Sequence, residues 1–491
     1  MDADTLVLAV DQGTSATKAI LVDRKGAVVA TASVPMSQSH PQPDWAEQDA
    51  MAIWESVQAV VAGCMEGQDP RHVAAVGLST QRESTLLWER ESGRPLAPVL
   101  GWQDGRGAAV CAGLRGAGYG DEVRSISGLP LDPMWSSSKA AWLLDEYDAD
   151  RSRSRGGELC LGTIDSWLLA CLGGGHIIET GNASRTQLLD LTSRRWDASL
   201  LELFKIPEAV LPAVVPSTGP FTSAGRLRPL GDDVAVTGVL GDSHAALFAH
   251  GAWEPGQVKA TYGTGSSVMG ITKQIEVGSP SLCRCIAWEA DEPSFALEGN
   301  IRSSGATVAW LATLLGTTPK DIAAQAADDA QGVHLVPAFT GLGAPWWDDR
   351  AVGIVSGLRF GTGQAHLARA ALESIAFQVE DVVAEVECEV GAVRTVLVDG
   401  GPTENVDLMQ LQADTSGRTV LRALAGNLSA LGAAYMAGLA GGVWSAQEIR
   451  ALQRERESFE PLSDDITRIR RRNGWHEAVA RSRIQFDTST E

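Results

Sequence analysis

One acidic side chain, Asp242, occupies a position in the sequence that suits proton transfer. A mostly apolar run from Val234 to Val239 leads into Gly241 and Asp242, and the Ala-rich segment that follows favours a helix. The pattern predicts a buried strand that ends in a tight turn and places a carboxylate at the start of a helix. Such a carboxylate can accept the proton of a substrate hydroxyl. It can equally cap the helix, which is a common use of Asp at this position.

Two turns rich in Gly and hydroxyl residues lie far apart in the chain and have similar flanks. Gly13-Thr14-Ser15 lies between apolar runs at 6–10 and 19–22, and the turn at 263–267, which contains Thr264, lies between strand-like runs at 257–262 and 268–272. Backbone N–H groups and hydroxyls in such turns can surround a phosphate. The first turn is not a Walker P-loop, and an ordinary hairpin with a polar turn is the alternative for it. Two such hairpins predict an internal duplication that holds phosphates from both sides.

Two charged residues flank the first turn. Asp11 ends the preceding apolar run, where a carboxylate can hold Mg²⁺ directly or through water. Lys18 follows the turn and can reach phosphate oxygens. The pair is therefore a candidate for binding a metal–phosphate group.

A second group of polar residues is suited to a polyol. Gln81-Arg82-Glu83 follows the predicted strand at 73–78, and these side chains can bind several hydroxyls through paired hydrogen bonds. A weak surface ion pair is the alternative. The segment from Trp102 to Arg106 puts an aromatic ring beside Asp104 and a guanidinium, which also fits a carbohydrate pocket.

Glycines in the second half mark candidate nucleotide contacts. Gly400 and Gly401 follow the predicted strand at 395–398 and allow a flat ring or a ribose to approach, although a simple strand–turn–helix corner fits equally well. Gly305, at the start of a predicted helix over 304–315, would also allow a ligand to approach the backbone. Long helices are predicted over 364–385 and, as a solvated terminal helix, over 464–483.

The composition is that of a soluble globular protein with more than one domain. The chain has 491 residues and a net charge of −21, which argues against general binding of nucleic acid or anionic membranes. No apolar run is long enough to span a membrane, and the first residues lack a basic signal region, so a cytoplasmic location is expected. The seven cysteines form no zinc-site pattern. We expect a domain boundary near residue 245, which gives domains 1–245 and 246–491.

Taken together, these motifs resemble those of the FGGY carbohydrate kinases, most closely their glycerol kinase branch, over about residues 5–445. The resemblance is carried by the order and spacing of Asp11-Gln-Gly-Thr, Gln81-Arg-Glu, Asn182-Ala-Ser-Arg-Thr, Gly241-Asp, Tyr262-Gly-Thr-Gly, Pro337-Ala-Phe-Thr-Gly-Leu, Asp399-Gly-Gly and Ala430-Leu-Gly-Ala-Ala-Tyr. The segment from Gly353 to Glu373 also fits the second signature of the family. The first signature fits at 134–146 apart from Ala140.

The resemblance implies an α/β fold with two actin-like ATPase (ribonuclease H-like) domains and a deep interdomain cleft. It implies ATP and Mg²⁺, a small sugar or polyol as the partner molecule, and a homodimer or homotetramer. Asp242 would be the general base, and Asp11 would organise Mg²⁺. The implied ATP contacts are Thr14, Ser15, Lys18, Thr264, Gly305, Ala309, Gly401 and Asn405. The implied contacts to the acceptor are Arg82, Glu83, Trp102 and Asp242.

Three departures from glycerol kinases concern the acceptor. This chain has Met134 where they carry Tyr, Ser243 where they carry Gln, and Ser267 where they carry Phe. The side chains at 243 and 267 are both shorter, and the one at 267 also replaces an apolar wall by a hydroxyl, which predicts a roomier and more polar pocket. An Asp in the stretch at 102–106 resembles the ketose kinases. We therefore expect a ketose or polyol of four to six carbons, such as xylulose, ribulose, erythritol or erythrulose. A glycerol kinase is the alternative, as is a sugar- and ATP-binding sensor without kinase activity.

Overall fold

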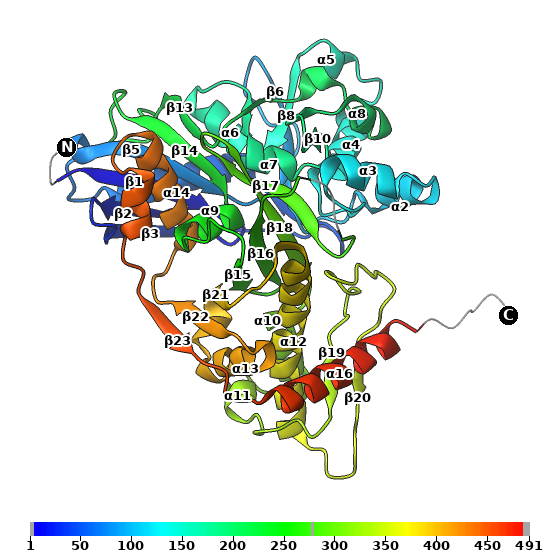
Figure 1. Ribbon diagram of the computed structural model, residues 1–491. Helices are drawn as coiled ribbons and strands as arrows, with labels where there is room; N and C mark the ends of the chain where they lie inside the picture. The colour runs from blue at the N-terminus through cyan, green and yellow to red at the C-terminus, as the bar shows by residue number, and fades with distance from the viewer. Residues whose placement is uncertain (1–3, 276–278, 485–491) are drawn as a thin grey trace.

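The computed structural model describes residues 4–275 and 279–484, which build two main β-sheets (Figure 1). The first sheet has the order β13-β14-β5-β1-β2-β3, and the second has the order β17-β18-β16-β15-β21-β22-β23. The strands of the first sheet are β1 (Leu6–Gln12), β2 (Ala16–Asp23), β3 (Val28–Pro35), β5 (Val73–Thr80), β13 (Thr218–Ser223) and β14 (Ala235–Gly241). Those of the second are β15 (Gln257–Tyr262), β16 (Ser266–Thr272), β17 (Cys283–Glu289), β18 (Pro293–Ile301), β21 (Thr395–Asp399), β22 (Thr419–Ala423) and β23 (Arg456–Phe459).

The two sheets share a five-strand arrangement. In the first, β1, β2 and β3 pair antiparallel in succession, while β5 and β14 extend from β1 as parallel strands. In the second, β15, β16 and β18 are the antiparallel strands, and β21 and β22 are the parallel ones. The predicted hairpins are therefore confirmed, and they occupy equivalent places in the two sheets. This is the structural repeat that the similar turns predicted.

Helices cover the sheets because their apolar faces match the inward-pointing strand residues. Helix α1 (Ala50–Cys64) packs through Val57 and Val61 on one face of the first sheet, and α12 (Gln364–Val390) packs through Val379 and Val382 on the second. Helix α12 extends five residues past the predicted end and stops at Gly391.

A smaller α/β region is built mainly from the segment between β5 and β14, and it also includes the short strand β4 from ahead of β5. It contains the four-stranded sheet β4-β7-β6-β8 and several helices, including α4 (Ser136–Tyr147) and α7 (Thr180–Ser184). Its strands are β4 (Glu47–Gln48), β6 (Thr85–Glu89), β7 (Val99–Leu100) and β8 (Leu159–Thr163). In Figure 1 most of this region lies at the upper right, in cyan and green-blue. It carries the polar segments at 81–106 and 182–185 toward the second sheet.

Helix α14 (Leu428–Ala440) comes from the second half of the sequence but packs on the first sheet, against β1, β5 and β14 and against α9 (Asp242–Ala249). Its small residues allow very close contact, since a Cβ atom at Gly432 would lie 1.8 Å from the carbonyl oxygen of Ala245. The helix α9 continues past the predicted boundary at 245, and the second sheet begins at Gln257. The boundary itself stays a prediction.

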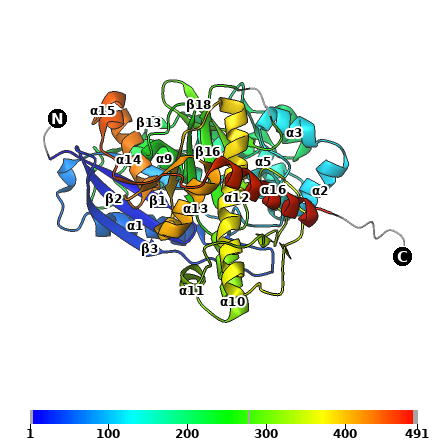
Figure 2. The same ribbon diagram turned by 60° about the horizontal axis from the view of Figure 1, so that its bottom comes forward.

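The terminal helix differs from the prediction of a solvated helix. Helix α16 (Asp465–Ser482) buries Trp475, whose indole N–H donates to Asp381 Oδ2 of α12 at 2.8 Å. Figure 2 shows α16 crossing α12. The Arg-rich part of α16 is also partly buried, since Arg472 Nη1 lies 3.1 Å from Glu380 Oε1 of α12, and the last turns of the helix belong to a core. Among the described residues, none of the helices combines the length and apolar character that a membrane crossing requires.

Candidate active site

The carboxyl ends of three parallel strands bring the predicted catalytic residues to one edge of the first sheet. In the register of β1, β5 and β14, Thr80 lies opposite both Gln12 and Gly241, so the segments that follow these strands emerge side by side. Asp11 is the second-to-last residue of the first strand, Arg82 follows the second strand, and Asp242 follows the third. Ligands of open α/β sheets bind at this edge.

Asp242 is the first residue of α9, and the helix is capped by Gly241 without a side-chain hydrogen bond. Asp242 is therefore not the N-cap residue, although its carboxylate accepts one backbone N–H of the first turn. Its Oδ1 accepts from the N–H of Ser243 at 2.6 Å and from Arg82 Nε at 3.2 Å. Its Oδ2 receives no hydrogen bond from any residue that the structure describes, and 35% of the side chain is exposed. One oxygen is thus held in place while the other can accept a proton.

Asp11 lies close to Asp242 and is mostly buried. Ser79 donates to its Oδ1 at 2.7 Å. Burial, together with repulsion from Asp242, raises the pKa of Asp11 to about 6, against the opposing effects of the Ser79 hydrogen bond and the charge of Lys18. Two neighbouring carboxylates under mutual repulsion form a set of oxygen donors that suits a divalent cation.

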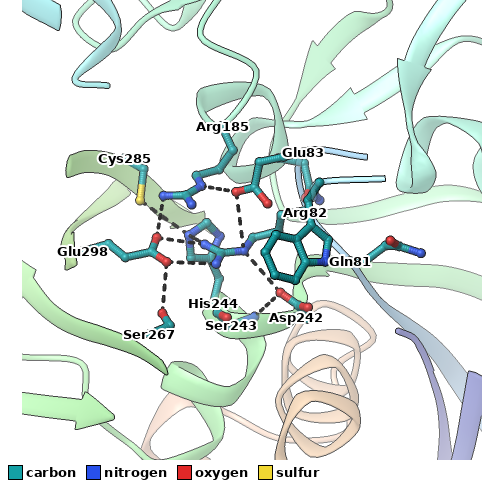
Figure 3. Close-up of polar contacts among 12 residues, drawn as sticks. Gln81, Arg82, Glu83, Arg185, Asp242, Ser243, His244, Ser267, Cys285 and Glu298 are labelled. Atoms are coloured by element: carbon teal, nitrogen blue, oxygen red, sulfur yellow. Dashed lines mark hydrogen bonds and ion pairs between the residues drawn. The ribbon is translucent and has the colours of Figure 1, made fainter. Parts of the chain in front are cut away.

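A buried ion network lies beside Asp242 and joins the two sheets (Figure 3). Arg82 donates from Nη1 and Nη2 to the two carboxylate oxygens of Glu298, both at 2.9 Å, and Glu298 lies on β18 of the second sheet. Arg185 donates to Glu298 Oε2 and to Glu83 Oε1. Burial alone would raise the pKa of Glu298, but the two guanidiniums outweigh it and hold this pKa well below its usual range. The network fixes Arg82, which in turn orients Asp242.

Further side chains complete this network. Ser267 Oγ donates to Glu298 Oε1 at 3.0 Å, and His244 Nε2 lies 3.3 Å from Arg82 Nη1 and 3.5 Å from Cys285 Sγ. Burial and the nearby Arg82 hold the pKa of His244 well below its usual range, so this imidazole is neutral. His244, Cys285 and Glu298 are close enough to share an ion, but the two guanidiniums already satisfy the carboxylate. The cluster is an ion-pair network rather than a metal centre.

The predicted acceptor residues surround the same edge. Trp102 Nε1 donates to Thr14 Oγ1 at 3.1 Å, so the ring predicted to contact the acceptor also contacts the first phosphate turn. Met134 is half-buried and packs beside Trp135. Ser243 is half-buried next to Asp242, and its carbonyl oxygen lies 3.4 Å from Lys259 Nζ.

Asp104 does not reach the acceptor pocket. It is 1% exposed, and its oxygens accept from the N–H of Ala46 and from Arg106. Arg106 in turn lies over the rings of Trp45 and Trp142, 3.9 and 4.9 Å from their centroids. The prediction that this carboxylate and guanidinium serve a carbohydrate pocket is wrong, because they satisfy each other within the fold. Only Trp102 of that segment stays a candidate.

The two predicted phosphate turns expose N–H groups in the same way. In the first, the carbonyl oxygens of Thr14 and Ser15 accept from Gln48 Nε2 and from the N–H of Met36. In the second, the carbonyl oxygen of Thr264 accepts from the N–H groups of Ser304 and Ala306. Within 4–275 and 279–484, no acceptor pairs with the N–H groups of Thr14, Ser15 or Thr264. In both turns the carbonyl oxygens of these residues accept hydrogen bonds while their backbone N–H groups stay free, an arrangement that suits the binding of an anion.

The predicted nucleotide contacts lie around α10 (Gly305–Leu315) and α13 (Val406–Ser416). The role predicted for one of them, Gly305, needs revision. The N–H of Gly305 donates to the carbonyl oxygen of Gly263 at 2.9 Å, and a Cβ at Gly305 would lie 2.6 Å from that oxygen. Gly305 is therefore required by packing of the turn, rather than by a ligand at its backbone N–H. A Cβ at Gly401 would meet no atom within 4 Å, so this glycine faces open space.

Two other predicted contacts lie nearby. Ala309 is exposed on α10. Asn405 caps α13, and its Oδ1 accepts from the N–H of Leu408 at 3.2 Å. The Asn405 Nδ2 has no partner within the described part of the chain, so it can donate to a ligand. Lys18 projects from β2 beside the first turn.

Glu298 and Arg185 were not identified from the sequence as site residues. Each is a lone charged residue in an otherwise neutral or apolar segment, Phe295-Ala-Leu-Glu298-Gly and Asn182-Ala-Ser-Arg185. A charge in such a segment requires a buried partner of opposite sign. That signal predicts a pair but cannot identify its members, because they are 113 residues apart.

The comparisons with known proteins agree with this geometry. The model of the FGGY carbohydrate kinase N-terminal domain matches residues 6–249, and that of the C-terminal domain matches residues 258–441. A glycerol kinase of Aromatoleum aromaticum is 44% identical, over 97% of this chain and 98% of the relative. An apulose kinase of Pectobacterium atrosepticum is 41% identical, over 98% and 99%.

A solved structure agrees in fold. The Plasmodium falciparum glycerol kinase with ADP superposes with a TM-score of 0.91 at 27% identity, covering 98% of this chain and 99% of that one. Two family models that together cover most of the chain, and relatives above 40% identity over nearly its whole length, establish the family. The chain belongs to the FGGY carbohydrate kinases, ATP-dependent phosphotransferases that act on hydroxyl groups and have two actin-like domains.

Proposed function

We propose that this kinase phosphorylates a hydroxyl of a ketose or polyol of four to six carbons, with Asp242 as the general base. The observation that carries the proposal is the asymmetric environment of the Asp242 carboxylate. Oδ1 is anchored by Arg82 and by the N–H of Ser243, whereas Oδ2 is free to receive a proton. The carboxylate is therefore oriented before the substrate binds, which is the requirement for a positioned base.

The two turns supply the charge stabilisation that phosphoryl transfer needs. The transition state is loose, so positioning and neutralisation of charge carry most of the rate enhancement. The free N–H groups of Thr14, Ser15 and Thr264 would bind the phosphates of ATP, with Lys18 as an added cation. Ala309, Gly401 and Asn405 would contact the nucleoside, and Gly305 would shape the second turn.

Asp11 would hold Mg²⁺, together with water and phosphate oxygens. The fit rests on the position of Asp11 near Asp242, where a cation would offset the burial and the repulsion from Asp242 that together raise the Asp11 pKa. When bound, Mg²⁺ neutralises phosphate charge. The residues of this chain bind the phosphates, orient the acceptor and remove its proton.

The acceptor would lie against Trp102 and Met134, with Arg82, Glu83 and Ser243 near its hydroxyls. Ser267 does not line the pocket as a free hydroxyl, because it donates to Glu298. A longer acceptor is therefore supported by the small side chains at 243 and 267 and not by Asp104. Glycerol is the second candidate, since several relatives above 40% identity are named glycerol kinase.

A coupled assay of ADP release with a panel of acceptors tests the substrate. The panel contains glycerol, erythritol, erythrulose, xylulose, ribulose and apulose. A four- to six-carbon acceptor should have the highest kcat/KM, and glycerol should be poor. Glycerol as the best acceptor by a wide margin would overturn the proposed pocket. Binding of sugar and ATP without ADP release for any acceptor would favour the sensor alternative.

Asp242→Asn tests the base. The amide preserves size but accepts no proton, so kcat should fall by about 10²- to 10⁴-fold while ATP and acceptor affinities stay near those of the wild type. Asp414→Asn is a matched control, because Asp414 lies on α13, where it accepts from Gln410 and from backbone N–H groups of 462–463. A kcat for Asp242→Asn within a few-fold of the wild type would contradict the assignment.

A further inference from the structure

In the described part of the chain, three segments pass between the two halves, and hydrogen bonds join the third of them to both of the others. The segment 250–256 leads from α9 to β15, the segment 424–427 leads from β22 to α14, and the segment 452–455 leads from α15 (Ala446–Ala451) to β23. Arg454 Nε donates to the carbonyl oxygen of Ala249 at 2.7 Å, and Arg456 Nη2 donates to that of His250 at 2.5 Å. In Figure 1, β23 runs down the left side of the lower half from this junction.

A pocket of about 460 Å³ opens at the junction. Its wall combines residues of the first and third passages with three arginines. The lining consists of His250, Gly251, Trp253, Glu254, Gln257, Arg450, Leu452, Arg454 and Arg456. None of these residues belongs to the candidate active site.

Of the three arginines in this pocket, only Arg450 pairs with a carboxylate of the described residues. Arg454 donates to the carbonyl oxygens of Ala249, Ile449 and Leu452, and across the described residues neither Arg454 nor Arg456 has a carboxylate within ion-pair distance. Burial lowers the pKa of Arg454, and burial together with Arg454 lowers that of Arg456. Two half-buried guanidiniums without a counterion are unusual in a chain with a net charge of −21.

The single carboxylate in the lining is already matched. Glu254 pairs with Arg450 Nη2 at 3.5 Å and with Lys273 Nζ at 3.9 Å. His250 Nε2 contacts Asp399 Oδ2 at 2.7 Å, so Asp399 faces the imidazole rather than the arginines. The guanidinium of Arg450 also lies 5.1 Å from the ring centroid of Trp253. The pocket therefore offers guanidinium donors around an aromatic wall.

From this arrangement we infer that the pocket at the junction binds a compact phosphate-bearing anion, and that its occupancy changes the affinity of the nucleotide site. Arg450 and Arg456 would bind the phosphate oxygens, since guanidinium donors match phosphate geometry. The second part of the inference rests on the proposed function. It follows from the His250–Asp399 contact, because Asp399 immediately precedes Gly400 and Gly401 of the nucleotide turn.

Inorganic pyrophosphate is the probe, titrated calorimetrically into the full chain with saturating ADP so that the phosphate turns are filled. We expect one additional pyrophosphate site per chain. Arg450→Gln and Arg456→Gln should each weaken it by about tenfold, the usual loss for a charge-assisted hydrogen bond. Glu254→Gln should strengthen it several-fold by removing a negative charge from the wall. A gain of affinity cannot result from misfolding.

Arg94→Gln is the matched control, because Arg94 is also exposed and paired with a glutamate but lies on the inserted region. It should leave pyrophosphate binding unchanged. Pyrophosphate that binds only in competition with ADP, or equally well to Arg450→Gln and Arg456→Gln, would overturn the site. Adding pyrophosphate should change the dissociation constant of ADP by some factor. Adding ADP should change the dissociation constant of pyrophosphate by the same factor, because binding couplings are reciprocal. Equal ADP affinity with and without pyrophosphate would overturn the coupling, whereas failure of ADP to bind at all would count against the proposed function instead.

Discussion

Arg82 and Glu298 form a two-point ion pair that connects the loop after β5 of the first sheet with β18 of the second, through two contacts of 2.9 Å. The same guanidinium donates from Nε to Asp242 at 3.2 Å. The position of the proposed base is therefore tied to the contact between the two sheets. A substitution of Glu298 on the second sheet should therefore shift Asp242 through Arg82, although Glu298 and Asp242 are not in contact.

Glu298→Gln should be strongly destabilising. The variant removes the carboxylate that both buried guanidiniums share, which leaves Glu83 as the counterion of Arg185, and Glu83 and Asp242 as those of Arg82. Loss of one partner from a buried ion pair costs about 3–5 kcal/mol. Urea unfolding followed by circular dichroism measures the effect. Glu292→Gln, at an exposed position just before β18, should change the free energy of unfolding by less than about 0.5 kcal/mol. Equal stability of the two variants would mean that the network is not structural.

The same carboxylate should give the protein acid sensitivity. The pKa of Glu298 in the folded protein is lower than the 4.5 of an unperturbed glutamate, because Arg185 and Arg82 favour the ionised form against the effect of burial. Its stabilisation is therefore present above pH about 4.5 and is lost as the pH falls below that value. Melting temperatures between pH 6 and pH 3 should fall more steeply for the wild type than for Glu298→Gln. Parallel curves would contradict this assignment.

Gly400 and Gly401 are adjacent but should respond differently to alanine. Gly400 has a φ of 99°, and a Cβ there would lie 1.9 Å from the carbonyl oxygen of Tyr262, so Gly400→Ala should unfold at lower temperature. Gly401→Ala adds a methyl group in open space and should leave the melting temperature unchanged. It should nevertheless raise the KM for ATP, by about tenfold, if a nucleotide fills that space. An unchanged KM for ATP in Gly401→Ala would remove Gly401 from the nucleotide site.

The hydrogen bond from Trp102 to Thr14 should couple the acceptor site to the phosphate turn. Trp102→Phe keeps an aromatic wall but removes the Nε1 donor, and Thr14→Val removes the acceptor. Each change should lower kcat/KM about fivefold, because it removes a hydrogen bond that contributes about 1 kcal/mol. The double variant should be little worse than either single variant, because both remove one interaction. Additive losses would show that the two side chains act independently.

Much of the fold follows from local patterns in the sequence. The apolar runs around 6–22 and 257–272 predict both hairpins because residues in a hairpin pair with close neighbours in the chain. The strand before Asp242 and the helix after it are predicted for the same reason. These local features were sufficient to place Asp11, Thr14, Asp242 and Thr264 at strand ends.

Long-range partners could not be predicted in the same way. The sequence shows a carboxylate at Asp104 beside Trp102, but only the structure shows that Arg106 and the N–H of Ala46 occupy it. The burial of Trp475 likewise depends on Asp381, 94 residues away. Three expectations stay predictions: the cytoplasmic location, the homodimer or homotetramer, and the domain boundary at 245. The structure of a single chain does not test them.

The packing of α14 has a consequence for how the chain acquires its structure during synthesis. Val7, Ala9 and Leu240 of the first sheet are buried in a cluster with Ala433 and Met436 of α14. The ribosome releases the strands of this sheet long before it releases the helix that covers them. An apolar face of the nascent protein therefore stays exposed until residues up to Ala440 have left the exit tunnel and α14 can pack on it. A fragment that stops after α9 would keep that face permanently bare, and it should associate with itself or with chaperones.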